Sequence, residues 1–167
     1  MLISSVCYCP DEGVPHGPSP YEPLSDDIIR YSSQGEVFLV GDFNARTQSR
    51  QCTVFQMNRN LEMVNVDPLD IGTTRRSKDQ GADATSFGHY LLELGSRHQM
   101  IIYMDLAKLP GSKELTCFPC GGAETTFDYI IGRPEVIHMI KSFRVAPFPI
   151  GINHSFLYFS HQNTIHT

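Results

Sequence analysis

The chain has 167 residues, with 13 basic and 18 acidic side chains, so its formal net charge is −5 with histidine neutral. Hydrophobic residues make up 41% and charged residues 19%, which excludes disorder along the whole length and predicts one globular domain. No apolar run approaches the roughly 20 residues of a membrane span. The N-terminal residues have no basic, signal-peptide-like segment, so we expect an intracellular protein, nuclear or cytoplasmic, that is not secreted.

The first half of the sequence predicts two strands and one helix, followed by loops. Residues 2–9 are apolar and β-prone and predict a strand, and the proline-rich residues 10–20 predict a loop. Apolar side chains then recur with the spacing of an amphipathic helix. They are Tyr21, Leu24, Ile28 and Tyr31. Residues 36–40 predict a buried strand that ends at Gly41, and residues 45–85 predict long loops with at most one short helix.

The second half predicts one more helix and then a succession of strands. The helix is expected over residues 86–98, with Thr85 or Ser86 as its N-cap. Short strands are expected at residues 100–104, 114–118, 126–131, 140–146 and 155–159. Because strands alternate with helices early and then follow one another, the pattern predicts a mixed α/β sandwich.

Asp42 and Asn44 lie directly after the strand predicted at residues 36–40, in the motif Gly-Asp-Phe-Asn. In α/β sheets, functional groups gather at the carboxyl ends of strands, where side chains face a crevice. Asp42 can act as a base or a metal ligand, and Asn44 offers both a hydrogen-bond donor and an acceptor. The same residues also suit an Asx-turn that only closes the strand, so both interpretations stay open.

Asp128 interrupts the apolar run over residues 126–131, and His154 precedes the last predicted strand. A buried carboxylate is costly unless it is paired, and a carboxylate partner fixes the tautomer of an imidazole. The two residues can therefore form a catalytic pair in which the histidine donates to a phosphate oxygen. Alternatively, Asp128 faces water on an edge strand and His154 is an ordinary surface histidine.

Taken in this order, the motifs resemble the endonuclease/exonuclease/phosphatase superfamily. The most specific piece is Val-Gly-Asp-Phe-Asn-Ala-Arg-Thr at residues 40–47, which is most similar to the endonuclease domains of LINE-type retrotransposons. Residues 6–10 resemble the family's strand that ends in Tyr-x-Pro, and residues 87–94 resemble its helix Asn-x-x-Gly-x-x-Leu-Leu. The resemblance covers nearly the whole chain and implies a partial four-layered α/β sandwich whose first strands are missing.

The resemblance also implies a role for each matching residue. Asp42 matches the aspartate that activates the attacking water, and Asn44 the asparagine that positions the phosphate. Asp128 matches the carboxylate that orients the catalytic histidine, His154, and Tyr8 matches a tyrosine that hydrogen-bonds the phosphate. The implied reaction is phosphodiester hydrolysis with Mg²⁺ or Mn²⁺, and the implied partner is nucleic acid, DNA rather than RNA.

Two departures from the family pattern bear on activity. Asn153 stands where the family has the aspartate of Ser-Asp-His, and a neutral amide binds a hard cation less well. The family's metal-binding Glu lies on a strand before Tyr-x-Pro, whereas Met1 is only seven residues before Tyr8, so we expect that strand to be absent. Residues 1–167 then form one truncated domain, a retroelement-derived remnant that binds metal weakly if at all and has little or no nicking activity. Its uncovered sheet favours self-association.

Two interpretations without catalysis remain open beside this one. The first is a truncated domain that only binds a partner. The second is a zinc-stabilised interaction module, because four of the five cysteines have a spacing that can supply zinc thiolates. These are Cys7, Cys9, Cys117 and Cys120.

Overall fold

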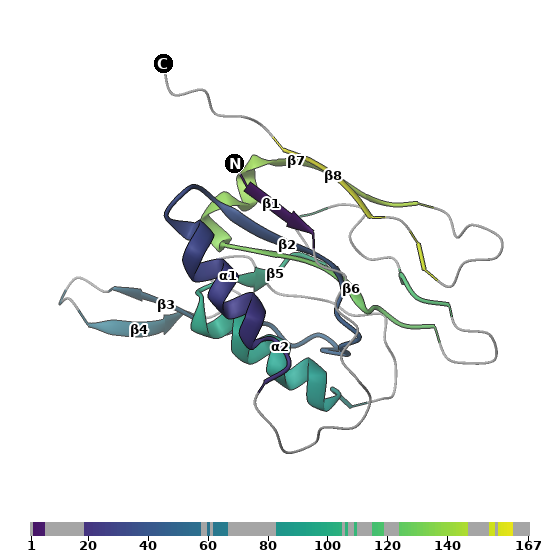
Figure 1. The fold of residues 1–167 in the computed structure, drawn as a ribbon, viewed down its shortest axis with the longest axis horizontal. Helices are drawn as coiled ribbons and strands as arrows, with labels where there is room; N and C mark the ends of the chain where they lie inside the picture. The colour runs from purple at the N-terminus through teal and green to yellow at the C-terminus, as the bar shows by residue number, and fades with distance from the viewer. Residues whose placement is uncertain are drawn as a thin grey trace.

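The computed structural model describes residues 2–5, 19–57, 60, 62–66, 83–104, 106, 109, 115–118, 124–146, 154–155 and 157–161. The strands are β1 (Leu2–Ser5), β2 (Val37–Asp42), β3 (Val54–Met57), β4 (Met63–Val66), β5 (Ile101–Ile102), β6 (Asp128–Gly132), β7 (Ile140–Val145) and β8 (Leu157–His161). The helices are α1 (Glu22–Ser32) and α2 (Ser86–Arg97), and a 3-10 helix, η1, covers Pro134–Met139 (Figure 1).

A four-stranded sheet with the order β1-β2-β6-β5 forms the centre of the molecule. β1 runs parallel to β2, and β6 runs antiparallel to both β2 and β5. All five residues of β6 are buried, as are the first three of β2. A strand covered on both faces is a continuous apolar run rather than an alternating one, which explains why the sequence shows these two strands so clearly.

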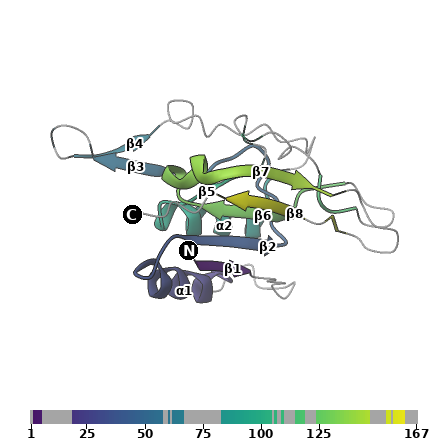
Figure 2. The same ribbon diagram turned by 90° about the horizontal axis from the view of Figure 1, so that it is seen from above.

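The two long helices and the β7–β8 pair lie on opposite faces of this sheet (Figures 1 and 2). α1 and α2 lie side by side and are joined at one end, where the Ser25 hydroxyl and His98 Nε2 are 2.7 Å apart. Each helix buries the apolar stripe that its sequence predicts, with Leu24 and Ile28 on α1 and Leu91 and Leu94 on α2. Among the described helices, none is long and apolar enough to cross a membrane.

The β3–β4 hairpin is the main element that the sequence does not predict. The loops expected over residues 45–85 are wrong here, because β3 and β4 pair antiparallel from Val54–Val66 to Met57–Met63. The hairpin projects away from the central sheet (Figures 1 and 2) and leaves several apolar side chains exposed. Each strand has only four residues, so its period of two is too short to distinguish from loop sequence.

Other boundaries differ from the sequence prediction by small amounts. The strand expected at residues 114–118 is, among the described residues, an isolated bridge at Cys117, and the strand at residues 100–104 shortens to Ile101–Ile102. β2 does not end at Gly41 but continues to Asp42. The predicted N-cap is confirmed, since Thr85 Oγ1 accepts a hydrogen bond of 3.1 Å from the Gly88 amide.

Candidate active site

Asp42 and Asp128 face each other at the paired ends of β2 and β6. The antiparallel register places Asp42 directly opposite Asp128, and the Phe43 amide donates to the Phe127 carbonyl 3.0 Å away just beyond them. Like charges directly opposite each other on paired strands are destabilising. A cation or a hydrogen-bond donor between the two carboxylates offsets that repulsion.

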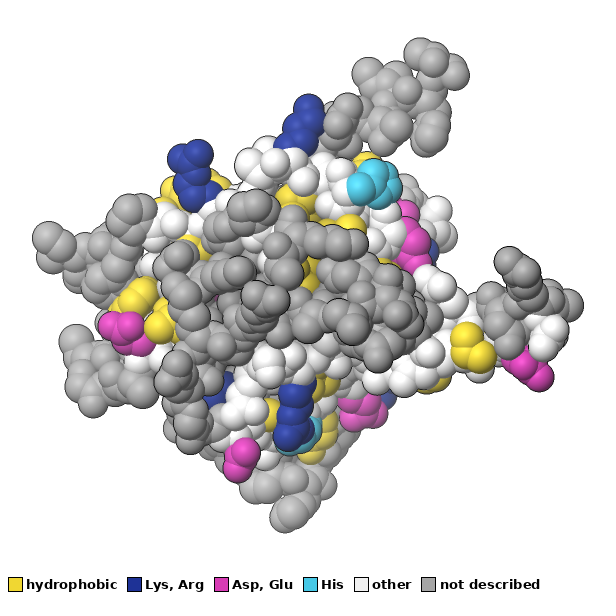
Figure 3. Space-filling view, turned by 180° about the vertical axis from the view of Figure 1, so that it is seen from behind, with side chains coloured by type: hydrophobic (Ala, Val, Ile, Leu, Met, Phe, Trp, Pro, Cys, Tyr) yellow, Lys and Arg dark blue, Asp and Glu magenta, His cyan; other side chains and the backbone are white. Residues whose placement is uncertain are grey.

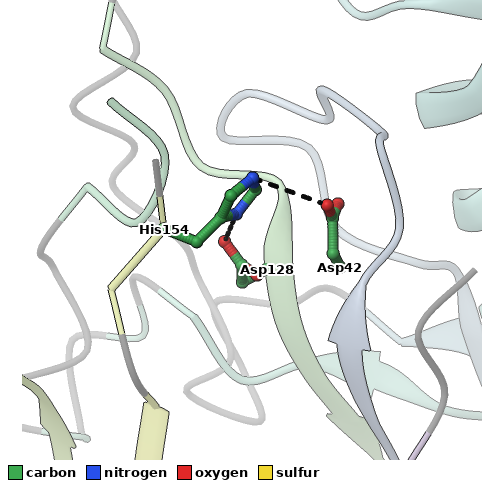
Figure 4. Close-up of side chains that lie close together, drawn as sticks. All are labelled: Asp42, Asp128 and His154. Atoms are coloured by element: carbon green, nitrogen blue, oxygen red, sulfur yellow. Dashed lines mark hydrogen bonds and ion pairs between the residues drawn. The ribbon is translucent and has the colours of Figure 1, made fainter. Parts of the chain in front are cut away.

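The imidazole of His154 occupies this position between the carboxylates (Figure 4). Its Nδ1 is 3.0 Å from Asp128 Oδ2, a hydrogen bond in which the ring N–H donates, and its Nε2 is 3.7 Å from Asp42 Oδ2. His154 is held there by its bridge to Cys117 and by the Ser155 amide, which donates to the Thr116 carbonyl. The Asp128–His154 hydrogen bond that the sequence predicts is thus confirmed, and Asp42 lies beside this pair.

Asp128 is the buried member of the group, and the edge-strand alternative for it is wrong because β6 lies inside the sheet. Only 8% of Asp128 is exposed, and this burial raises the pKa of its carboxyl, against the lowering effects of His154 and Thr116. The side chains of Asp42 and His154 keep 30% and 35% of their surface exposed. The cluster is therefore anchored in the core at Asp128 and open to solvent at the other two residues.

Asn44 adopts a left-handed backbone conformation with φ of 46°. Its amide donates to Asp42 Oδ1 at 2.7 Å, so the Asx-turn that the sequence allows does form. The turn and a functional role for Asp42 are compatible, because the hydrogen bond fixes the carboxylate while Oδ2 points to His154. The role of Asn44 in positioning a phosphate stays a prediction.

Two buried tyrosine hydroxyls hold the loop that follows Asp42. The Tyr21 hydroxyl donates to the Phe43 carbonyl at 2.7 Å, and the Tyr129 hydroxyl lies 2.8 Å from the Ala45 carbonyl. A buried tyrosine usually finds a partner for its hydroxyl. Here each hydroxyl contacts a backbone carbonyl of this loop, and the Tyr129 hydroxyl is also 2.8 Å from the Thr126 carbonyl. The sequence presents these tyrosines only as members of apolar patterns, so it does not reveal this positioning role.

The start of α2 holds the same loop from the other side. Thr85 Oγ1 accepts from the Arg46 amide at 3.1 Å, and the Thr85 amide donates to the Arg46 carbonyl at 3.0 Å. Gly88 permits this contact, because a Cβ at that position would lie 2.0 Å from the Arg46 carbonyl oxygen. The loop after Asp42 is therefore clamped between α2 and the tyrosine hydroxyls.

Comparison with known proteins places this geometry in a known fold. No family model and no curated protein sequence matches the chain. Among solved structures, it is similar to the "endonuclease domain of TRAS1, a telomere-specific non-LTR retrotransposon", with a TM-score of 0.56 and 15% identity. It is equally similar to the "3'-5' exonuclease (NExo) from Neisseria meningitidis", again with a TM-score of 0.56 and 15% identity. The chain has part of the endonuclease/exonuclease/phosphatase fold.

The extent of this match supports the expectation of a partial fold. The alignment covers 97% of this chain and 57% of the TRAS1 domain, and 95% of this chain and 60% of the exonuclease. The chain therefore spans less than two thirds of the length of either nuclease. The mixed α/β architecture that the sequence predicts is confirmed, and the endonuclease/exonuclease/phosphatase resemblance is confirmed at the level of fold.

Cys117 also lies in the site, although the sequence does not assign it there. Its Sγ lies 3.6 Å from His154 Nε2, and burial together with the charges of Asp128 and Asp42 raises the pKa of the thiol to about 11. The only sequence signal for Cys117 is its spacing from other cysteines, which points to a different site. Cys7, Cys9 and Cys120 lie outside the described residues, so a four-thiolate site stays a hypothesis.

Two further residues assigned from the resemblance also lie outside the described residues: Tyr8, expected to contact phosphate, and Asn153, at the altered metal position.

The side chains of Asp42, Asp128 and His154 lie close enough together to meet the distance requirement of a metal site. Asp42, Asp128 and His154 each offer one donor atom, and these atoms lie within 4.8 Å of one another. The cluster can hold a metal ion.

Proposed function

We propose that the chain is a metal-dependent phosphodiesterase that acts on nucleic acid, DNA rather than RNA. The observation that carries this proposal is the convergence of Asp42, Asp128 and His154 at the ends of β2 and β6 in a nuclease fold. The two similar solved structures are an endonuclease domain and a 3'-5' exonuclease, which supports a nucleic-acid substrate. The likeness of residues 40–47 to LINE-type endonucleases supports a retroelement origin.

The side chains divide the chemistry between them in this proposal. Asp128 accepts from Nδ1 and so orients the imidazole, leaving Nε2 of His154 to face the substrate. His154 stabilises charge on the phosphate, and Asp42 acts as the general base toward water. Asn44 and Tyr8 position the phosphate. The Asx-turn and the loop clamp keep Asp42 in one orientation, which preorganises the site before substrate arrives.

Mg²⁺ or Mn²⁺ fits this donor set only in part. Mg²⁺ prefers oxygen ligands in an octahedron and is usually held by one or two carboxylates together with substrate phosphates. Asp42 and Asp128 would hold it, but each already accepts a hydrogen bond, from Asn44 and His154 respectively. When bound, the metal neutralises charge on the phosphodiester oxygens. We therefore propose weak Mg²⁺ binding and impaired cleavage.

Basic side chains do not gather into a patch on the face of the described surface that Figure 3 shows. The described lysine and arginine side chains stand apart there. Nonspecific affinity for DNA depends on many Lys and Arg contacts to phosphates. The described residues of this face therefore offer few such contacts.

A plasmid-nicking assay tests the proposal. We expect slow conversion of supercoiled to nicked DNA in Mg²⁺ or Mn²⁺, its loss in EDTA, and its loss in Asp42→Ala and His154→Ala. Loss of a general acid or base typically costs roughly 10²–10⁴ in rate. His89→Ala and Asp83→Ala are matched controls at exposed positions outside the site and should cleave like the unmodified chain.

Two outcomes would contradict the proposal. Nicking that persists in both Asp42→Ala and His154→Ala would come from another site or a contaminant. Complete absence of cleavage, combined with a gel shift of DNA that the same variants do not weaken, would favour the alternative of a domain that binds without catalysis.

A further inference from the structure

Arg46 carries a positive charge beside the site and has no acidic partner. Its Nε donates to Thr125 Oγ1 at 3.3 Å, and its guanidinium carbon lies 5.9 Å from the centre of the Phe127 ring. Among the described residues no carboxylate pairs with Arg46, whereas Arg97 is paired with two glutamates. We infer that Arg46 binds a backbone phosphate next to the one that is cleaved, an inference that rests on the proposed function.

A ladder of paired backbone segments places this guanidinium on the same face as His154. Thr125 pairs with Cys117, and Cys117 pairs with His154 on its other side. Directly paired residues have side chains on one face, about 4.5–5.5 Å apart at Cβ, and the 3.6 Å between Cys117 Sγ and His154 Nε2 agrees with this. Thr125 and His154 are then about 10 Å apart. Arg46, bonded to Thr125, therefore flanks the site, within reach of a neighbouring phosphate of the same strand.

The arginine is held in place before any substrate arrives. Its amide donates to Thr85 Oγ1 and its carbonyl accepts from the Thr85 amide, so both backbone polar groups of Arg46 are fixed. The hydrogen bond to Thr125 and the Phe127 ring fix the half-buried side chain. A flexible arginine loses conformational entropy when it binds a ligand. Because Arg46 is already ordered, it binds a correctly placed phosphate at a lower entropic cost.

The guanidinium keeps the donors that phosphate recognition needs. Its terminal nitrogens form a planar fork that matches two phosphate oxygens. The hydrogen bond to Thr125 uses only Nε, so the fork of Arg46 stays available. A purely structural role is the competing explanation, but a partly buried charge is costly unless it is paired. An anionic ligand accounts for the unpaired charge, and a structural contact to a neutral threonine does not.

The charge of Arg46 also offsets a repulsion that the site creates. In the proposed reaction a phosphodiester anion approaches Asp42 and Asp128, which carry charge of the same sign. Weak metal binding cancels only part of this repulsion. A fixed positive charge on the same face attracts the nucleic-acid strand whether or not a metal is bound.

Binding of a fluorescent duplex DNA to the full chain, followed by anisotropy in EDTA so that no DNA is cleaved, is the test. We expect Arg46→Gln to weaken binding roughly 5–30-fold at low salt. The slope of log K against log salt concentration should become shallower by about 0.9, the contribution of one phosphate contact. Arg46→Lys keeps the charge but not the fork, so it should keep the slope and bind with intermediate affinity. An unchanged slope in Arg46→Gln would assign the residue a structural role only and overturn the inference.

Arg30→Gln is the matched control for the change in net charge. Arg30 is exposed and also lies over an aromatic ring, 5.4 Å from the centre of Tyr31. It stands near the end of α1 that leads into the start of β2, at the opposite end of that strand from Asp42. Arg30→Gln should leave both the affinity and the salt slope unchanged. An equal effect of the two substitutions would show that only net charge matters and would overturn the inference.

The binding assay separates this inference from the proposed reaction. If DNA binding depends on Arg46 but no DNA is nicked, only the proposed reaction fails. If nicking occurs and Arg46→Gln keeps the salt slope, only this inference fails, and the same holds if the unmodified chain does not bind DNA at low salt. Where nicking is observed, Arg46→Gln should raise KM and leave kcat within about twofold, because a contact made equally in the ground and transition states changes KM alone. A lower kcat with unchanged KM would contradict a contact to a neighbouring phosphate.

Arginine labelling of the unmodified chain keeps the test decisive if Arg46→Gln and Arg46→Lys do not fold. Phenylglyoxal modifies guanidinium groups, and mass spectrometry of peptides gives the rate at each arginine. We expect duplex DNA to slow the labelling of Arg46 and to leave that of Arg30 unchanged. Equal labelling of Arg46 with and without DNA would overturn the inference.

Discussion

The contact between Gly88 and the loop after Asp42 makes Gly88→Ala a sharp test of how the site is held. In a solvent-exposed helix, replacing glycine with alanine stabilises by about 1 kcal/mol, because glycine is the poorer helix former. At Gly88 the added Cβ would lie 2.0 Å from the Arg46 carbonyl oxygen and 2.8 Å from its carbon. The loop must therefore move outward by at least about 1 Å to reach contacts that real proteins show.

The magnitude follows from what that movement breaks. The two hydrogen bonds between Thr85 and Arg46, at 3.0 and 3.1 Å, both span the gap that must widen. Each is worth about 0.5–1.5 kcal/mol, and overpacking itself costs typically about 1–3 kcal/mol. Set against the gain in helix propensity, we expect Gly88→Ala to lower the free energy of unfolding by about 1–3 kcal/mol. Helix propensity alone predicts the opposite, an increase in the free energy of unfolding.

Urea denaturation followed by circular dichroism measures this difference. His89→Ala is the matched control, since position 89 is the next residue on the same helix and is exposed, and it should be neutral or slightly stabilising. Thermal melts should agree, with a shift of roughly 2–4 °C for each kcal/mol in a chain of this size. A Gly88→Ala protein as stable as the unmodified chain would show that α2 does not hold the loop closely.

Three further changes have expected outcomes. Tyr129→Phe removes the buried hydroxyl that contacts the Ala45 carbonyl and should lower the free energy of unfolding by about 1–3 kcal/mol in the same urea assay; a neutral result would contradict the clamp. Burial and the nearby Arg97 charge lower the pKa of His98 below 6.5, so the unfolded chain binds the proton more readily. Stability should therefore fall as the pH decreases below about 6.5, and His98→Gln should flatten that slope. Arg97→Gln breaks an exposed ion pair with Glu22 and should change stability by less than about 1 kcal/mol; a larger loss would mean that the pair joins the helices more firmly than its exposure implies.

Much of the fold could be predicted because burial leaves a direct trace in the sequence. The stripe of α1 and the apolar runs of β2 and β6 are patterns set by which faces are covered. The grouping of Asp42, Asp128 and His154 in one site could be predicted through the family resemblance, because the strand patterns alone left ordinary alternatives open for each of the three residues. The β3–β4 hairpin was missed because its short strands pack mainly against each other and leave no long pattern.

The remaining parts of the site depend on contacts between distant segments and leave no such trace. Cys117 reaches His154 through an isolated bridge between segments 37 residues apart in sequence. The hydroxyls of Tyr21 and Tyr129 find backbone partners 22 and 84 positions away. Sequence spacing grouped Cys117 with other cysteines, because spacing describes neighbours along the chain and cannot show a partner brought in by the sheet.

The direct pairing of Asp42 with Asp128 ties the assembly of the site to the alignment of two strands. Side chains alternate between faces along a strand, so a slip of one residue between β2 and β6 would turn one aspartate away from the other. Insertions in the connections between the strands leave that alignment untouched, whereas the deletion of a single residue within β2 or β6 removes it. Asp42 and Asp128 therefore face each other only when β2 and β6 are correctly aligned, and a misaligned molecule lacks the site.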